Sequence, residues 1–166
     1  MGVASNLITI EGCLEDFRRK AQEFHARPLD PFLACDCAIA AWSIYDWVKE
    51  FHKERLGFET KAEMFNGITS QCPELAHLRE VANYRKHGKA ETGTLTLKRY
   101  DQHDHSFSRG FNEDHTSGSL QLITANNEKI WMEDAILAAL AFWEAFFVAQ
   151  GIIDAPPHTS QGGEGL

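Results

Sequence analysis

The sequence predicts a mainly α-helical protein: a bundle of about four main helices with a small antiparallel β-hairpin or sheet inserted before the last helix. Two observations support this fold class. Apolar residues recur at three- and four-residue spacings over several long segments, which is the period of an amphipathic helix. After Gly88 the pattern changes to alternation of apolar and polar residues, which indicates strands.

Apolar stripes indicate the first two helices. The first helix ends at Arg27-Pro28, because proline disfavours helical geometry in the residue before it. The second begins at about Pro31, a favoured first-turn residue, and runs to Arg55, with Gly57 positioned to end it. Its apolar surface is so wide that we expect neighbours on two sides. The stripe residues are Leu14, Phe17, Ala21 and Phe24 in the first helix and Cys37, Ile39, Ala41, Trp42, Ile44, Trp47, Val48 and Phe51 in the second.

A third helix and a small sheet follow. Asn66-Gly67 predicts a turn, and Cys72-Pro73 opens a helix that Gly88 ends. The polar loop Asp101–Ser119 is unusually long for the inside of one domain, which indicates a mobile or functional segment. The predicted strands around it are Thr94–Leu97, Leu120–Thr124 and Lys129–Trp131.

The last helix spans roughly Glu133–Gln150, and Gly151 ends it. It is apolar nearly all round, so one small neighbour cannot cover it. We therefore expect it to lie at the centre of the bundle, or to form a dimer surface as well. Residues 1–153 are predicted to form one helical domain, and residues 154–166, rich in Pro, Gly and Ser, a disordered C-terminal tail.

Length and charge exclude several classes of protein. The chain has 166 residues, the length of one domain, and a formal net charge of −8, which argues against unspecific binding to nucleic acid or anionic membranes. The N-terminal segment lacks the features of a secretory signal, and the longest apolar run, Ala135–Trp143, is too short for a membrane span. We therefore expect a cytoplasmic protein without membrane contact.

The cysteines lack Cys-x-x-Cys spacing, which favours reduced, packed thiols over a zinc site or disulfides.

The third helix carries the side chains best suited to catalysis. Arg79, Asn83 and His87 recur every four residues and so share a polar stripe, predicted to lie opposite the helix's apolar face. An imidazole transfers protons near neutral pH, a guanidinium holds a phosphate, and a carboxamide orients either group. The stripe therefore predicts phosphodiester chemistry, with His87 as general acid or base, Arg79 on the phosphate and Asn83 as the orienting residue.

The same residues also have a structural explanation. Solvated helix faces are often rich in such side chains, and His87 and Lys86 complement the dipole at a helix C-terminus. Arg85 lies at a helical angle within the apolar face, where it needs a carboxylate partner or must extend to solvent. We expect Asp46 of the second helix to be that partner.

A basic segment surrounds the end of the third helix, although the whole chain is acidic. Such a patch favours contact with RNA phosphates, and we expect Arg85, Lys86 and Lys89 to be the binding residues. Clusters of this size also occur as ordinary solvated surface. The cations of the segment are Arg79, Arg85, Lys86, Lys89, Lys98 and Arg99, and its only acids are Glu80 and Glu91.

The segment Ala82–Gly88 resembles the motif of HEPN domains of prokaryotic toxin and defence systems. In that motif an Arg, commonly followed by Asn, precedes a His by a few residues near a helix end. Asn83 and His87 match in type and spacing, whereas Ala82 stands in the place of the Arg and Arg79 lies further from the His than the motif allows. The resemblance implies a helical, dimeric endoribonuclease that acts on RNA without a metal or another cofactor.

Two further hypotheses remain. His103, His105 and His115 alternate with Asp residues, as in sites for divalent metals, but in a polar loop such residues are more often solvated, so we predict no metal site. The alternative to an RNA-binding or RNA-cleaving protein is a non-catalytic interaction protein that forms homodimers through its aromatic last helix.

Overall fold

The computed structural model describes residues 8–88, 96–100, 119–124 and 126–154. Within these residues the chain is mainly helical, with a three-stranded antiparallel sheet placed before the last helix, which confirms the predicted fold class. The elements are α1 (Ile10–Ala26), α2 (Pro31–Phe51), α3 (Lys61–Gln71), α4 (Glu74–His87), β1 (Thr96–Tyr100), β2 (Ser119–Ile123), β3 (Lys129–Trp131) and α5 (Met132–Ala149).

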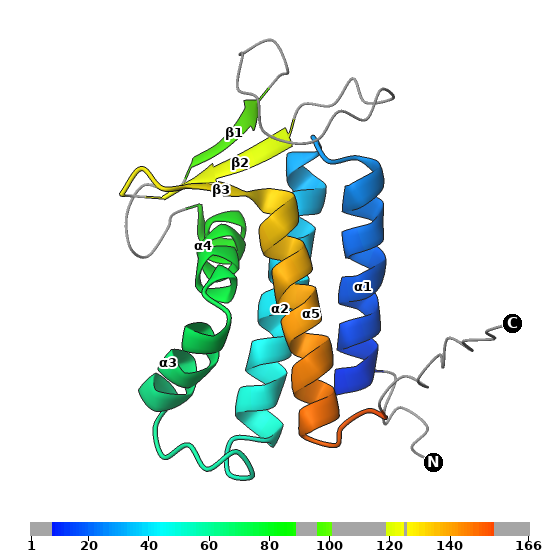
Figure 1. Cartoon of the computed structure of the whole chain (residues 1–166), viewed down its shortest axis with the longest axis vertical. Coiled ribbons are helices and arrows are strands. Elements are labelled where there is room, and N and C mark those ends of the chain that lie inside the picture. Colours follow the sequence, from blue (N-terminus) through cyan, green and yellow to red (C-terminus); the bar gives the residue numbers. More distant parts are fainter. Residues whose placement is uncertain (1–7, 89–95, 101–118, 125, 155–166) are drawn as a thin grey trace, which may run out of the picture.

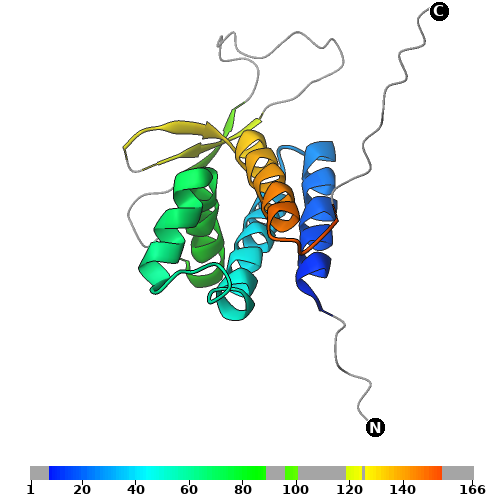
Figure 2. The same cartoon turned by 60° about the horizontal axis from the view of Figure 1, so that its bottom comes forward.

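Helix α2 runs through the middle of the bundle. α1 packs along one side of it, and α3 and α4 lie on the other side in both views (Figures 1 and 2). α5 contacts α1, α2 and α4, and it also packs against strands β2 and β3. α5 thus has neighbours on several sides, but Leu137, Ala141 and Ala145 are exposed along one face of it, so the prediction that the last helix lies at the centre of the bundle is wrong.

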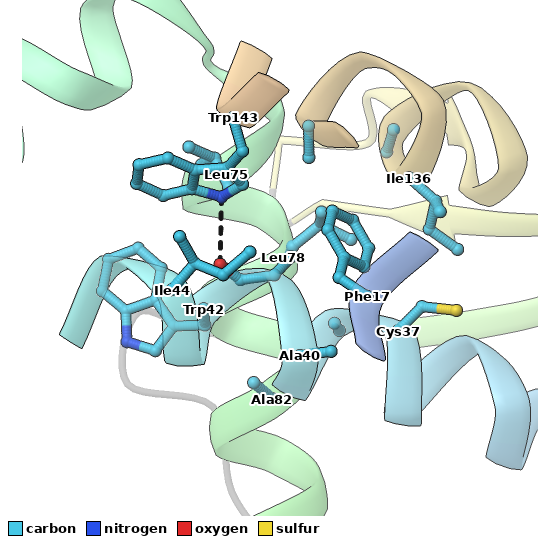
Figure 3. Packing of buried hydrophobic residues seen from close by; sticks show 14 of the residues in the cluster. Phe17, Cys37, Ala40, Trp42, Ile44, Leu75, Leu78, Ala82, Ile136 and Trp143 are labelled. Carbon is cyan, nitrogen blue, oxygen red and sulfur yellow. Dashed lines mark hydrogen bonds between the residues drawn. The ribbon is translucent and has the colours of Figure 1, made fainter. Parts of the chain in front are cut away.

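The core lies where α1, α2, α4 and α5 meet. Trp143 of α5 is fully buried, and its indole Nε1 donates a hydrogen bond to the carbonyl of Ala41 at 3.1 Å (Figure 3). This bond satisfies the one polar atom of the buried ring, which is the usual condition for burying a tryptophan. Phe17 and Leu78 bring the other helices to the same core.

Local signals fix where the helices begin and end. The Asp30 carboxylate accepts hydrogen bonds from the first amides of α2, and Thr60 and Glu63 form a reciprocal capping box at the start of α3. Gly88 ends α4 in the left-handed region at φ 69°, which glycine adopts without steric cost, and its amide donates to the carbonyl of Tyr84. The helix predicted from Cys72-Pro73 to Gly88 is thus confirmed.

The sheet lies at the end of the bundle where α4 ends and α5 begins (Figure 1). Its order is β1-β2-β3, and β3 leads directly into α5. Leu122 of β2 is fully buried and pairs with Leu97 and Ile130 on either side. The predicted loop at 101–119, apart from its last residue, and nearly all of the predicted tail lie outside the described residues.

Two boundary predictions are wrong. Asn66-Gly67 is not a turn but lies inside α3, an additional helix. A Cβ on Gly67 would come within 2.8 Å of the Phe58 ring, so glycine serves close packing at this position. The second helix ends at Phe51 rather than Arg55, and the chain continues in turns from His52 up to Gly57.

In the described part of the chain, no helix combines the length and the apolar character that a membrane span requires.

Candidate nucleic-acid interface

Helix α4 packs antiparallel to α2 and carries the predicted site residues along its length. Two arginines show the direction: Arg79 lies over the ring of Trp42, and Arg85 lies over the ring of Phe32, near the start of α2. The C-terminal turn of α4 is therefore beside the N-terminal turn of α2, at the same end of the bundle as the sheet (Figure 1).

Arg79 belongs to an aromatic cluster inside the bundle. Its guanidinium carbon is 5.5 Å from the centroid of the Trp42 ring and 5.0 Å from that of Phe65. Trp42 is in turn stacked on Tyr45 at 4.2 Å, and the Phe65 ring meets both rings edge-on. The half-buried arginine thus joins α4 to α2 and α3. The expectation that it lies opposite the apolar face of the helix is wrong.

The predicted polar stripe consequently divides. Asn83 is half-buried and His87 is exposed, whereas the guanidinium of Arg79 is directed to Trp42 and Phe65. Along the helix axis Arg79 and His87 are about 12 Å apart at 1.5 Å per residue. Asn83 and His87 remain neighbours one turn apart, and Lys86 lies on the same side, at the third position after Asn83.

The last turn of α4 presents its side chains to solvent. Tyr84, Arg85, Lys86 and His87 are all exposed. Lys86 and His87 have no ion pair or hydrogen bond among the described residues, in contrast to the arginines of α1, which pair with neighbouring acids. We call this group, together with Phe32, the α4 terminal surface.

The expected ion pair between Asp46 and Arg85 is wrong. Asp46 pairs with Lys49 at 2.9 Å on its own helix, and Arg85 is exposed, with its guanidinium carbon 5.4 Å from the Phe32 ring centroid. The reason is the antiparallel packing of the two helices. Arg85 is opposite Phe32, and Asp46 is about 21 Å further along α2 at 1.5 Å per residue.

Ala82, which occupies the arginine position of the HEPN motif, is fully buried. It lies in the core with Ala40 of α2, where small side chains allow the two helices to approach closely (Figure 3). An arginine at this position would have to place its charge inside the core, which is costly without a partner. The departure from the motif is therefore fixed by packing.

The cysteines are free thiols, and three of them, Cys35, Cys37 and Cys72, are buried. Burial raises the pKa of Cys37 to about 12 and that of Cys72 to about 11. Burial also raises the pKa of Cys35, although the charge of Arg85 opposes this shift. The prediction of packed thiols is confirmed, and their raised pKa values make them poor nucleophiles.

Some predicted residues lie outside the described part of the chain. These residues are Lys89, His103, His105 and His115. Among the described residues, no three His, Cys, Asp or Glu side chains are grouped so that they could hold a metal ion.

A surface hollow of about 580 Å³ lies at the other end of α2, near Phe51. It mixes lysines with glutamates, and Lys49 is already paired with Asp46. The mixed charge of this hollow therefore does not favour the binding of an anion. The residues around it are Lys49, Glu50, Phe51, Lys53, Glu54 and Lys61.

Sequence reasoning missed Phe32 and Tyr84. Phe32 directly follows the first-turn Pro31 and falls outside the apolar stripe of α2, which is the signal that its ring is left at the end of the bundle. Tyr84 lies between Asn83 and Arg85 on a helix whose apolar face is formed by other residues.

Comparisons with protein-family models, with curated proteins and with solved structures found no match to this chain.

Proposed function

We propose that the protein binds RNA through the α4 terminal surface. The observation that carries this proposal is the last turn of α4, where Arg85, Lys86 and His87 are exposed and the latter two have no ion pair among the described residues. Phosphates are the ligands that such adjacent cations favour. Because the whole chain carries a charge of −8, this binding is local and depends on that surface.

The resemblance to HEPN domains extends the proposal to cleavage. His87 would act as general acid or base towards a ribose 2′-hydroxyl, with Asn83 one turn away to orient it. Lys86, on the same side of the helix, would neutralise the charge that develops on the phosphate. Arg79 has no part in this reaction, because its guanidinium is held by Trp42 and Phe65.

Binding is tested with a fluorescein-labelled RNA of mixed sequence that contains a stem and a loop, by anisotropy over a salt series. The double variant Lys86→Ala/His87→Ala should weaken binding about tenfold, and the salt slope should fall by about one for each phosphate that is no longer neutralised. Lys53→Ala/Lys61→Ala, at the other end of α2, is the matched control and should bind like wild type. Equal affinity of the two double variants would contradict the proposal.

Cleavage is tested separately with the same RNA in the presence of EDTA. Wild type should release fragments with 2′,3′-cyclic phosphate ends, and His87→Ala should lose at least about a hundredfold in rate, the lower range for a general acid or base. Equal rates for wild type and His87→Ala would refute catalysis and leave the binding proposal in place.

The outer face of α5 favours self-association as a second function. Leu137 is 50% exposed, and Ala141 and Ala145 continue its row along the helix. We propose that a second copy of the chain covers this row. Light scattering over a concentration series should detect a dimer, and Ala141→Arg should yield a folded monomer. A monomer at all concentrations in wild type would refute this second proposal.

We also place the protein in the cytoplasm. Its free thiols are compatible with a reducing compartment, and RNA is accessible there. Fluorescence microscopy of a tagged chain tests this placement.

A further inference from the structure

Two aromatic rings on the α4 terminal surface are exposed. Phe32 is 65% exposed and Tyr84 is 51% exposed, which places both among the few large hydrophobic side chains that are exposed in the described part of the chain. Neither ring belongs to the buried core. The two rings therefore contribute little to the packing of the fold and are accessible to a ligand.

One of the two rings is in contact with a cation, and the other is next to that cation along the chain. The guanidinium of Arg85 stands over the ring of Phe32, and Tyr84 precedes Arg85 on α4, three residues before the exposed His87. Asp30, two residues before Phe32, accepts hydrogen bonds from the amides of Phe32 and Leu33 and lies 3.6 Å from Arg27. Its charge is thus already compensated beside the ring.

Exposed rings next to cations are a combination by which proteins bind single-stranded nucleic acids. Bases stack on the rings while the cations contact the phosphates between them. In a duplex the base faces are already stacked on each other, so they are not accessible to a protein ring. Cations alone would therefore bind both forms, whereas the rings discriminate between them.

We infer that Phe32 and Tyr84 form a base-stacking site that selects unpaired nucleotides next to His87. This inference rests on the proposed RNA binding. The ligand class is a single-stranded segment of a few nucleotides, contacted through base faces rather than base edges. Such a site places an unpaired, flexible ribose near the imidazole. This is the conformation that attack by a 2′-hydroxyl on its own phosphate requires.

The test uses a labelled 12-nucleotide single-stranded oligouridylate and a 12-base-pair RNA duplex, measured by anisotropy at one salt concentration. Wild type should bind the single strand more tightly than the duplex. Phe32→Ala and Tyr84→Ala should each weaken single-strand binding about 5- to 150-fold, the range for loss of one stacked base, and should leave duplex binding unchanged. Tyr84→Phe keeps the ring and should retain affinity.

Phe51→Ala is the matched control, because Phe51 is also 65% exposed and lies at the other end of the same helix. It should bind both RNAs like wild type, and circular dichroism checks that each variant is folded. If wild type binds neither RNA, the proposed function itself fails. If wild type binds both equally and Phe32→Ala and Tyr84→Ala change nothing, the stacking inference is overturned while RNA binding stands.

Discussion

Arg79 and Arg85 lie on the same helix, and each has its guanidinium over an aromatic ring, yet the two contacts have different consequences. Arg79 is half-buried between Trp42 of α2 and Phe65 of α3. Arg85 is exposed over Phe32 at the end of the bundle. The first contact joins three helices, whereas the second leaves a cation and a ring accessible to a ligand.

The difference shows that the contribution of an arginine–ring contact to stability depends on how far the two groups are buried. A cation over a ring contributes more to stability where both are removed from water, because water no longer competes for the charge. The largest contribution is therefore expected in the Trp42 cluster. At the α4 terminal surface the same contact contributes little to the fold, so substitutions there test the proposed binding with little effect on stability.

Removing the ring beneath Arg79 should have the largest effect on stability. Trp42→Ala takes away a buried side chain that stacks on Tyr45 and carries the guanidinium, and should lower the free energy of unfolding by about 3–5 kcal/mol. Urea denaturation followed by circular dichroism measures this change. Trp47→Ala, a half-buried tryptophan on the same helix, is the control and should cost less. Equal losses of unfolding free energy in Trp42→Ala and Trp47→Ala would mean that the contacts of Trp42 with Tyr45 and Arg79 add nothing to stability.

Substituting the two arginines tests the comparison directly. Arg79→Ala should lower the free energy of unfolding by about 2 kcal/mol, and Arg85→Ala by about 0.5 kcal/mol, the values for desolvated and exposed cation–ring contacts. Arg79→Lys should recover part of the loss, because the charge remains while the planar group does not. If Arg85→Ala destabilises the protein as much as Arg79→Ala, burial does not separate the two contacts.

The sequence alone predicted the parts of the fold that are determined by residues close together along the chain. The stripe of α1, the proline and glycine that bound α4, and the apolar character of α5 all led to the observed helices. Helix α3 was missed because Gly67 indicates a turn, whereas the structure uses it to admit the Phe58 ring. That role depends on a contact between segments, which no local pattern contains.

The same limit applies to the candidate site. Helical spacing correctly placed Asn83 and His87 one turn apart, but it could not show that Phe65, on an unforeseen helix, reaches Arg79. Nor could it show that Arg85 faces Phe32 rather than Asp46, because this depends on how far α4 is shifted along α2. Direction and shift of packed helices are tertiary properties.

The carboxylate expected from the sequence to hold Arg85 supplies a smaller test. Asp46 is paired with Lys49 at the surface of α2, so Asp46→Ala should change the free energy of unfolding by no more than about 0.5 kcal/mol. A double-mutant cycle with Arg85→Ala, measured in urea, should give no coupling energy. Coupling above about 0.5 kcal/mol would reinstate an interaction between the two residues.

The smallest expected effect concerns Cys35, which senses the charge of Arg85. Burial raises the pKa of this thiol, and the nearby guanidinium opposes the shift. Arg85→Gln removes the charge while keeping a side chain of similar length, so the pKa should rise further and the fraction of reactive thiolate at pH 8.5 should fall. Alkylation by iodoacetamide, followed by peptide mass spectrometry, should then be slower at Cys35. Cys37, two residues along the same helix, is the internal reference, because Arg85 is not among the charges that act on it. An unchanged ratio of the two rates would show that the guanidinium is directed wholly to solvent and Phe32, and would separate Arg85 still further from the buried role of Arg79.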